Sequence, residues 1–557
     1  MSNEKTLKTW WKSGSPWVWL NAAAVTLSMI AVIGLLALIA VRGLAHFWAP
    51  DVYEFRYEEA DGEIVTLYGS IRDTEQVTAA RLRQAGMQLD DVESEFVDRH
   101  LIKMGNRDQL GSDFRFIVEP RIIERSTPTD IVMVERTEWG DQTGFLREVL
   151  ENSEVIARGA EAWPEFEQRI ARVVELREKI NELESDEIGA INYTLEQLRL
   201  EERHLELEGE LTDARLAELE SRRAELDERY QLLLQDLNAL YEKINRDSYV
   251  MEVQGGIDVE LPLARVVRAY QPNAMGFFGK LGFWFEKLWE FVSEEPREAN
   301  TEGGVFPAIF GTVVMVMLMS VFVTPFGVIA AVYLKEYARQ GAVTRIIRIA
   351  VNNLAGVPSI VYGVFGLGFF VYFLGGNIDQ LFYPEASPSP VFGTPGLLWS
   401  SLTLALLTLP VVIVATEEGL SRIPRSLREG SYALGATKAE TLWRTVLPMA
   451  SPAMMTGLIL AVARAAGEVA PLMLVGVVKL APSLPIDGNA PFVHLDRKFM
   501  HLGFHIYDVG FQSPNVEAAR PLVYATALLL VAIIIILNLA AVRIRNRLRE
   551  KYRALEN

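Results

Sequence analysis

The sequence predicts a mainly helical membrane protein whose spans are interrupted by one large soluble block. Half of the 557 residues are hydrophobic, yet the formal net charge is −18. The two facts agree because the charges are segregated: residues 51–300 hold 56 acidic and 30 basic residues, whereas the rest of the chain carries a net charge of +8. An acidic block argues against nucleic-acid binding, which needs a basic surface to neutralise phosphates. The absence of cysteine excludes disulfides, thiol catalysis and cysteine metal sites.

The first apolar segment runs from Pro16 to Leu44, with Trp17 and Trp19 near its start and Trp48 just beyond its end. About 20 apolar residues span a bilayer, and aromatic residues favour its interfaces. The segment is too long for a signal-peptide core and lacks a clear cleavage site. We therefore expect residues 1–50 to form a cytoplasmic N-terminus and a retained first span.

The soluble block opens with alternating, strand-like sequence. Tyr53 to Tyr57 and Ile64 to Tyr68 flank Asp61-Gly62, a dipeptide typical of hairpin turns. Further alternating runs follow at residues 113–123 and 130–135. We expect residues 51–155 to form a small α+β region.

Residues 156–248 carry a heptad pattern that predicts a coiled-coil helical hairpin. Gly209 is the best candidate for the turn, and Thr212 can cap the second arm. The apolar positions at three- and four-residue spacing include Val173, Leu176, Ile180, Leu183, Leu195, Leu198, Leu226, Leu233, Leu237 and Ile244. Two roles remain open for the hairpin: a solvated spacer, or a docking arm for a partner or a second copy.

Residues 249–300 predict an extended segment followed by an interfacial helix. Aromatic residues crowd the stretch from Phe277 to Phe291, where Lys280 and Lys287 interrupt the apolar run. A helix that mixes aromatic and charged residues in this way is typical of segments that lie on a bilayer surface.

Five further apolar spans are expected, at Val305 to Leu334, Asn353 to Leu374, Leu397 to Ala415, Ala453 to Val478 and Pro521 to Val542. Basic residues follow the second, fourth and sixth spans, whereas the loop from Gly375 to Gly396 has none. Since basic loops favour the cytoplasm, the pattern predicts that both termini are cytoplasmic in the inner membrane of a bacterium and that residues 51–300 are periplasmic.

A polar segment between the fourth and fifth spans predicts two short helices around a glycine turn. Pro424 can open the first helix, and Gly435 can end it in a left-handed conformation. Thr437 and Glu440 form a T-x-x-E capping box for the second helix, and Pro448 is expected to help close the segment. From these residues alone, an ordinary amphipathic helix pair at the membrane surface is the alternative.

This segment resembles the coupling loop of ABC importer permeases. Glu429 precedes Gly435 by six residues, and Leu447 and Pro448 follow it by twelve and thirteen. The family has two alanines after the glutamate, where this chain has Gly430-Ser431, and isoleucine where it has Thr445. The resemblance implies that Glu429, Gly435, Leu447 and Pro448 couple the chain to an ATPase.

A possible ion pair lies in the predicted fifth span. Arg464 is expected near the middle of that span, with Glu468 one helical turn later and Gly467 and Pro471 beside them. A lone arginine at a helix centre costs roughly 2.5–3.5 kcal/mol on insertion scales, so such a charge is paired or faces a cavity. A structural ion pair and a cationic station for an anion are both compatible with this pattern.

The third predicted span opens with Asn353, Gly356, Pro358 and Ser359, which suggests a broken or tightly packed start. This stretch and the sequence around Arg464 resemble A-type permeases of phosphate importers. The resemblance covers the first span and residues 301–557, the permease core, with a coupling loop at 417–451. It implies the six-helix type I ABC importer fold and a role in the substrate path for Arg464 and, with less support, for Glu468.

By the same resemblance, the protein would import inorganic phosphate together with a C-type permease, two ATPase subunits and a periplasmic phosphate-binding protein. The sequence holds no G-x-x-x-x-G-K-[ST] loop, so ATP and magnesium would bind to a partner and the chain would be no enzyme. The spacings of seven and four among His494, His501 and His505 are weak evidence for a metal site. Two solvent-exposed histidines on one helix face are expected instead, and no metal is assigned. Two alternatives remain: a permease for phosphonate, sulfate or molybdate, and a membrane-anchored coiled-coil sensor or scaffold.

Overall fold

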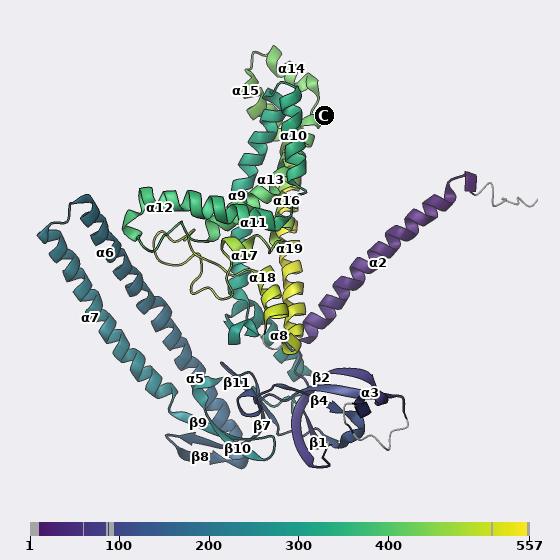
Figure 1. Cartoon of the computed structure of the whole chain (residues 1–557), viewed down its shortest axis with the longest axis vertical. Coiled ribbons are helices and arrows are strands. Elements are labelled where there is room, and N and C mark those ends of the chain that lie inside the picture. Colours follow the sequence, from purple (N-terminus) through teal and green to yellow (C-terminus); the bar gives the residue numbers. More distant parts are fainter. Residues whose placement is uncertain (1–10, 60, 85–86, 88–93, 514–515, 554–557) are drawn as a thin grey trace, which may run out of the picture.

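The computed structural model describes residues 11–59, 61–84, 87, 94–513 and 516–553 (Figure 1). Residues 1–10 of the predicted cytoplasmic N-terminus lie outside this part. Six helical segments are long and apolar enough to cross a membrane, as predicted: Ser15–Ala45, Phe306–Tyr337, Ser359–Phe382, Leu397–Arg422, Lys438–Gly467 and Ala519–Glu550.

Four of these segments form the central bundle. Helices α9 (Phe306–Val332), α13 (Leu397–Arg422), α16 (Leu447–Gly467) and α19 (Val516–Arg553) lie side by side in Figure 1. Their shared core includes the buried side chains Met315, Leu404, Ala461 and Ala465. Helix α2 (Ser15–Ala45) diverges from the bundle and meets α19 at one end, where Gly43 lies against the backbone of Ala525.

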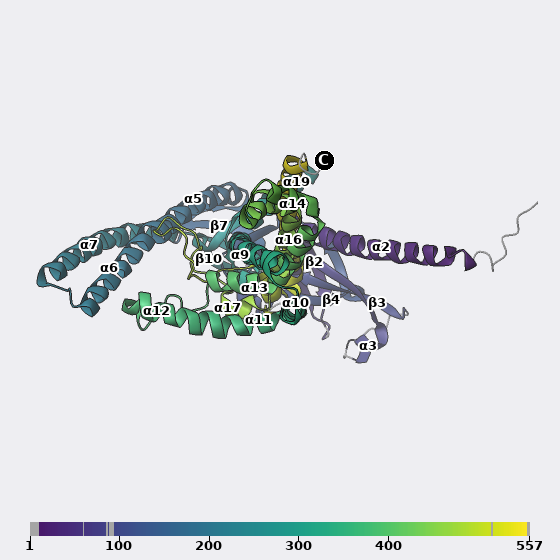
Figure 2. The same cartoon turned by 90° about the horizontal axis from the view of Figure 1, so that it is seen from above.

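The third span is built differently from the others. Helix α11 (Ser359–Phe365), a π-helical stretch (Gly366–Gly375) and α12 (Gly376–Phe382) run crosswise to α9 and α13 in Figures 1 and 2. The predicted start at Asn353 is wrong, because that residue belongs to a separate amphipathic helix, α10 (Ala342–Leu354). Pro358 is the N-cap of α11. Proline lacks the backbone N–H of a helix interior and disfavours helical geometry in the residue before it, so α10 and α11 are separate helices.

The soluble block contains two antiparallel sheets. The first has the strand order β4-β3-β2-β1-β5, and Tyr57 pairs with Val65 across the predicted Asp61-Gly62 turn. Its strands are β1 (Tyr53–Glu58), β2 (Ile64–Thr78), β3 (Phe96–Lys103), β4 (Phe114–Val118) and β5 (Ile122–Ser126).

The second sheet has the order β10-β9-β7-β6-β11, with β8 paired to β7. Its strands are β6 (Val132–Arg136), β7 (Gln142–Glu151), β8 (Glu154–Arg158), β9 (Asp247–Val253), β10 (Ile257–Pro262) and β11 (Val266–Tyr270). Strands from both sides of the helical segment therefore share one sheet. The predicted boundary at residue 155 falls inside β8.

A long helical hairpin leaves this sheet and returns to it. One arm contains α5 (Ala162–Glu182) and α6 (Gly189–Glu208), and the other is α7 (Asp213–Ile244). As predicted, Gly209 turns the chain with φ of 72°, and the Thr212 side chain accepts a hydrogen bond from the Arg215 amide. Several of the predicted apolar positions are buried, namely Val173, Ile180, Leu198, Leu233, Leu237 and Ile244.

The hairpin leans against two loops of the permease core. The Tyr193 hydroxyl of α6 donates a hydrogen bond to the Ala490 carbonyl, and the Tyr193 and His494 rings meet edge-on with their centroids 6.1 Å apart. Nδ1 of His204 lies 3.6 Å from Oε2 of Glu385, which is in the loop that follows α12. The hairpin thus contacts both the loop after the third span and the loop between the fifth and sixth.

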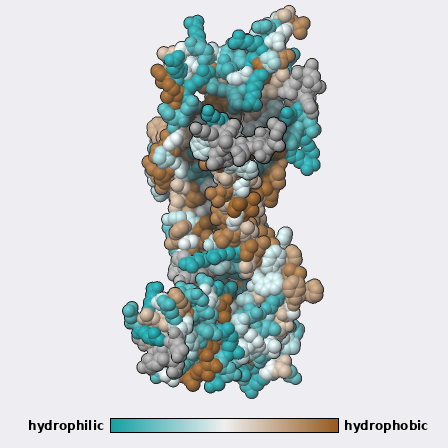
Figure 3. Space-filling view, turned by 90° about the vertical axis from the view of Figure 1, so that its right-hand side faces the viewer, coloured by the Kyte–Doolittle hydropathy of each residue, from teal (hydrophilic) through white to brown (hydrophobic). Residues whose placement is uncertain are grey.

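The surface separates polar and apolar residues along the long axis. Figure 3 shows hydrophobic residues gathered over the middle of the molecule, between two ends that are mostly hydrophilic. The soluble block forms one end, and the short helices that follow α13 form the other (Figure 1). This banding is what a protein that crosses a bilayer requires.

Candidate functional site

The segment after α13 folds as two short helices around a glycine turn. Helix α14 (Arg425–Ala433) has Pro424 as its N-cap and is followed by Gly435, whose φ is 87°. Helix α15 (Lys438–Thr441) begins with the predicted capping box: the Thr437 hydroxyl accepts from the Glu440 amide, and Glu440 accepts from the Thr437 amide at 2.8 Å. The local sequence therefore determines the shape of this segment.

The second half of the segment differs from the prediction. Pro448 does not close it, because the chain continues without a break from α15 through a π-helical turn (Leu442–Val446) into α16. Pro448 is the second residue of α16 and directly follows the π-helical turn. The second short helix is thus continuous with the fifth span, so a displacement of one moves the other.

Arg428 holds this segment against the end of α9. Its guanidinium donates to Glu336 at 2.9 Å and to the carbonyls of Ile423 and Leu420 at 2.8 and 3.0 Å. The Lys438 ammonium donates to the Glu336 backbone carbonyl. These contacts link the protruding helices to two spans at once.

Part of the protruding surface was not predicted from the sequence. Leu434 is 90% exposed and Trp443 is 75% exposed, and both lie close in sequence to the exposed Glu429. Large apolar side chains that face outward in a polar segment are candidates for an interaction surface. Their presence between two membrane spans was the signal that could have identified them.

Arg464 lies at the end of a helix rather than at the centre of a span. Helix α16 ends at Gly467, and Glu468 is already extended, with φ of −83° and ψ of 129°. The predicted span to Val478 is therefore wrong: it joins α16 to the separate short helix α17 (Leu472–Val475). Pro471 explains the break, because the residues before a proline disfavour helical geometry.

The ion pair between Arg464 and Glu468 is loose. Nε of Arg464 lies 3.6 Å from Oε1 of Glu468, and about a third of the Arg464 side chain is exposed. Within the described residues, Glu468 is the ion-pair partner of Arg464, and the 3.6 Å separation is too long for a hydrogen bond. A guanidinium has five N–H donors, so most of them remain available.

The start of the third span packs beside this break. A Cβ atom at Gly363 would lie 2.7 Å from the Cα of Pro471, so the two backbones are in direct contact. Tyr362 is buried in the same core as Ala465 and Leu472, and its hydroxyl donates to the Leu354 carbonyl at 2.6 Å. The fold therefore brings the region of Gly356, Pro358 and Ser359 toward the Arg464 end of α16.

The predicted residues thus fall into two groups at different places in the bundle. Arg464 and Glu468 lie near the third span, whereas Glu429, Gly435, Leu447 and Pro448 belong to the protruding helices or the opposite end of α16. Asn353 lies inside α10, one residue before its end at Leu354, and is apart from the break that begins α11. Helix α16 connects the two groups directly.

The three histidines of the last loop are buried, which contradicts the expectation of solvent exposure. His494, His501 and His505 are 5%, 1% and 2% exposed. Burial lowers the pKa of His501 and of His505 to about 4, so both are neutral at physiological pH. Within the described residues, no group of three or more His, Asp or Glu side chains is placed to hold a metal ion.

Comparisons with known proteins identify the family. Residues 323–550 match the model of the binding-protein-dependent transport system inner membrane component. The phosphate transport system permease protein PstA 1 of Mycobacterium tuberculosis is 35% identical over 275 residues, which cover 49% of this chain and 79% of that protein. The PstA protein of Yersinia pestis is 31% identical over 251 residues, which cover 45% of this chain and 75% of that protein.

Among solved structures, a chain of the inward-facing MetNI methionine ABC transporter aligns with 47% of this chain and 98% of its own length. That alignment has 20% identity and a TM-score of 0.31. The sequence comparisons are sufficient: the chain belongs to the PstA family of binding-protein-dependent transport components, and it is a multi-pass inner-membrane permease subunit of an ABC transporter that is not itself an ATPase.

Proposed function

We propose that this permease subunit imports inorganic phosphate, with the energy supplied by ATP that a partner subunit hydrolyses. The relatives named above are phosphate transport permeases, which supports phosphate as the substrate. The observation that carries the proposal is Arg464, a partly exposed guanidinium whose one ion pair is loose. Such a group can bind an oxyanion through several charge-assisted hydrogen bonds.

The proposed orientation in the membrane rests on the charge pattern. The positive-inside rule supports cytoplasmic chain termini, a cytoplasmic α14–α15 segment and periplasmic residues 51–300. Figure 1 supports this arrangement, because α14 and α15 lie at the end of the bundle opposite the soluble block. Phosphate would then enter from the side of the soluble block and leave near the protruding helices.

The α14–α15 segment is the surface on which an ATPase subunit would dock. Its exposed residues Glu429, Leu434 and Trp443 offer both charge and apolar area. Because Arg428 and Lys438 bind Glu336, and α15 continues into α16, a tilt of the segment would reach the second and fifth spans together. A C-type permease, two ATPase subunits and a periplasmic phosphate-binding protein complete the proposed assembly.

The function is tested by replacing Arg464 with glutamine, which removes the charge and leaves a polar side chain. We expect phosphate uptake to be lost while the ATPase subunits still copurify. An R464K variant should retain part of the uptake, lowered by about tenfold, the equivalent of ~1.4 kcal/mol, because lysine keeps the charge but loses the planar fork.

The matched control is Arg199→Gln on the hairpin, since Arg199 also forms an ion pair within one helical turn, with Glu196. Uptake by R199Q should equal that of the parent protein. Unchanged uptake by R464Q would rule out the anion station.

The identity of the substrate is tested separately. Purified complex should hydrolyse ATP faster with a phosphate-loaded binding protein. A response instead to a binding protein loaded with phosphonate, sulfate or molybdate would change the substrate and leave the permease role intact.

A further inference from the structure

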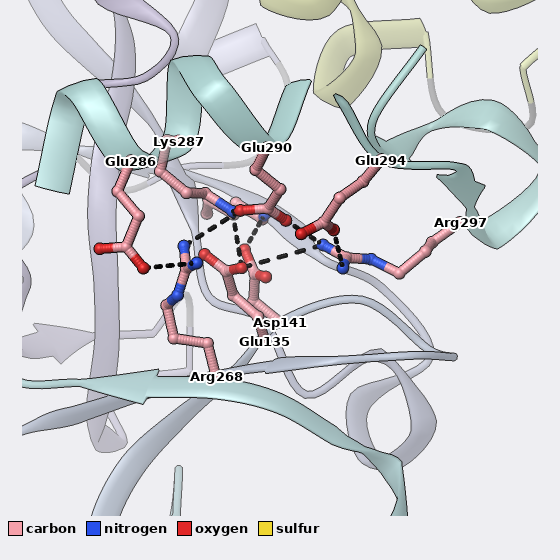
Figure 4. Close-up of polar contacts among 9 residues, drawn as sticks. Glu135, Asp141, Arg268, Glu286, Lys287, Glu290, Glu294 and Arg297 are labelled. Atoms are coloured by element: carbon pink, nitrogen blue, oxygen red, sulfur yellow. Dashed lines mark hydrogen bonds and ion pairs between the residues drawn. The ribbon is translucent and has the colours of Figure 1, made fainter. Parts of the chain in front are cut away.

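Helix α8 (Phe277–Ser293) connects the soluble block to α9, and its charged side chains all point to one side. The carboxylate of Glu290, which is 4% exposed, accepts from Lys287 at 2.9 Å, from Arg268 at 3.1 Å and from Arg297 at 2.7 Å (Figure 4). Lys287 also donates to Glu135 of β6 at 2.7 Å. This side of α8 is therefore fixed to the second sheet.

The other two charged residues of α8, Glu286 and Lys280, also pair with residues of the soluble block. Glu286 accepts from Arg268 of β11 at 2.9 Å, and Lys280 pairs with Asp51, which precedes β1. Each of the four charged side chains of the helix thus has a partner from the soluble block. Charges of an amphipathic helix normally face water, whereas here they hold the soluble block.

The opposite side of α8 is aromatic, and within the described residues the printed ring contacts of Phe278 and Phe285 are with Phe277 and Trp284 of the same helix. Phe278, Phe285 and Trp289 follow each other at intervals of seven and four residues and are 84%, 59% and 71% exposed. Leu281 and Leu288 lie beside them and are half-buried. No charged residue lies within this stripe, so water is a poor environment for it.

The position of α8 indicates which environment covers the stripe. The indole Nε1 of Trp284 donates to the Leu44 carbonyl at 2.8 Å, at the end of the first span, and the Phe47 and Phe291 rings pack with their centroids 5.2 Å apart. The chain then enters the second span at Phe306. The helix therefore lies level with the ends of two spans, where lipid headgroups meet the hydrocarbon.

We propose that α8 docks into the outer headgroup region of the bilayer through the stripe of Phe278, Phe285 and Trp289, and that it holds the soluble block on the membrane. Lipid is the occupant because the stripe is continuous with the ends of α2 and α9 and lacks charges. Aromatic rings favour this depth, and an amphipathic helix binds there through its apolar face. The inference concerns the anchoring of the soluble block and is independent of the transported substrate.

The test uses the absence of cysteine in the chain. Single variants Phe278→Cys, Phe285→Cys and Trp289→Cys carry a nitroxide spin label in the full complex, reconstituted in phosphatidylglycerol–phosphatidylethanolamine vesicles. Collision with oxygen, which concentrates in lipid, is compared with collision with a water-soluble nickel chelate. We expect at least a several-fold higher oxygen-to-nickel ratio at all three sites than at a label in water.

The water reference is Leu232→Cys on α7, where the native side chain is 57% exposed. Labels on α8 that collide with nickel as often as the label at 232 would show that the stripe faces water, and would overturn the proposal. Labels shielded from both reagents would show that protein covers the stripe, and would also overturn it. Three positions are used because at least one surface substitution should leave the fold unchanged, which normal ATP hydrolysis by the complex would confirm.

Discussion

Two groups of charged residues, one at the junction of α8 with the soluble block and one at the end of α16, are paired in opposite ways. At the junction of α8 with the soluble block, Glu290 is 4% exposed and receives three cationic side chains at 2.7–3.1 Å. At the end of α16, Arg464 has one partner at 3.6 Å and remains about a third exposed. The first arrangement satisfies its charges within the protein, and the second leaves hydrogen-bond donors unused.

The difference indicates separate roles for the two groups. A buried carboxylate that several cations surround is costly to disturb, because each unpaired charge would remain in a poorly solvated place. A loosely paired guanidinium costs little to rearrange, so it can exchange its partner for a ligand. We therefore expect substitutions at the junction to reduce stability, and substitutions near Arg464 to reduce transport.

The largest effect is expected for Glu290→Gln. The substitution leaves Lys287, Arg268 and Arg297 with one carboxylate fewer, and breaking a buried pair typically costs about 3–5 kcal/mol. The thermal unfolding midpoint of the detergent-solubilised complex should fall clearly below that of the parent. Glu196→Gln on the exposed hairpin is the control and should leave the midpoint unchanged; equal midpoints for the two variants would contradict the structural role of the junction.

A second prediction concerns the pH dependence of stability near this junction, at Glu302, whose backbone pairs with that of Arg297 in a short antiparallel ladder. Burial, together with the nearby Asp141 carboxylate, raises the pKa of Glu302 from its ordinary value of 4.5 to about 8. The folded protein therefore binds this proton more tightly than the unfolded chain does, so stability should fall as the pH rises from 4.5 to 8.

Glu302→Gln mimics the protonated side chain and should reduce that loss, which unfolding midpoints at several pH values would measure. Glu290 works in the opposite direction. Its burial would raise its pKa, but Lys287 and Arg268 outweigh this effect and lower it to about 2. The stability that Glu290 contributes should thus be lost below pH 4.5. The control is Glu220→Gln, at an exposed residue. If the unfolding midpoint of Glu302→Gln depends on pH in the same way as that of the control, the raised pKa of Glu302 is disproved.

The smallest effect on stability is expected for Glu468→Gln. The pair with Arg464 is 3.6 Å apart and partly open, and such pairs contribute less than about 1 kcal/mol. The unfolding midpoint should stay close to that of the parent, while phosphate uptake changes because Arg464 loses its counter-charge. A drop in stability like that of Glu290→Gln would mean that Arg464 and Glu468 are a structural pair after all.

Local chemistry allowed several elements to be predicted from the sequence. The turn at Gly209, the cap at Thr212, the left-handed Gly435 and the capping box of Thr437 and Glu440 each depend on neighbouring residues alone. The six apolar segments were equally clear, because their length is set by the thickness of a bilayer.

Other features depend on contacts that a single sequence does not reveal. The end of α16 at Gly467 was missed because apolar composition continues past the break as far as Val478. The pairing of β7 with β9 joins strands separated by the whole hairpin, and alternation alone does not indicate the partner of a strand. The burial of His501 and His505 is likewise decided by packing between distant segments.

The contact between Gly363 and Pro471 has a mechanical consequence. Since there is no room for even a methyl group between them, the third span and the loop beyond α16 cannot slide past each other without first separating. We therefore expect the third span and this loop to move together. We expect a larger residue at position 363 to push the two backbones apart and to reduce transport, although the substitution changes no charge.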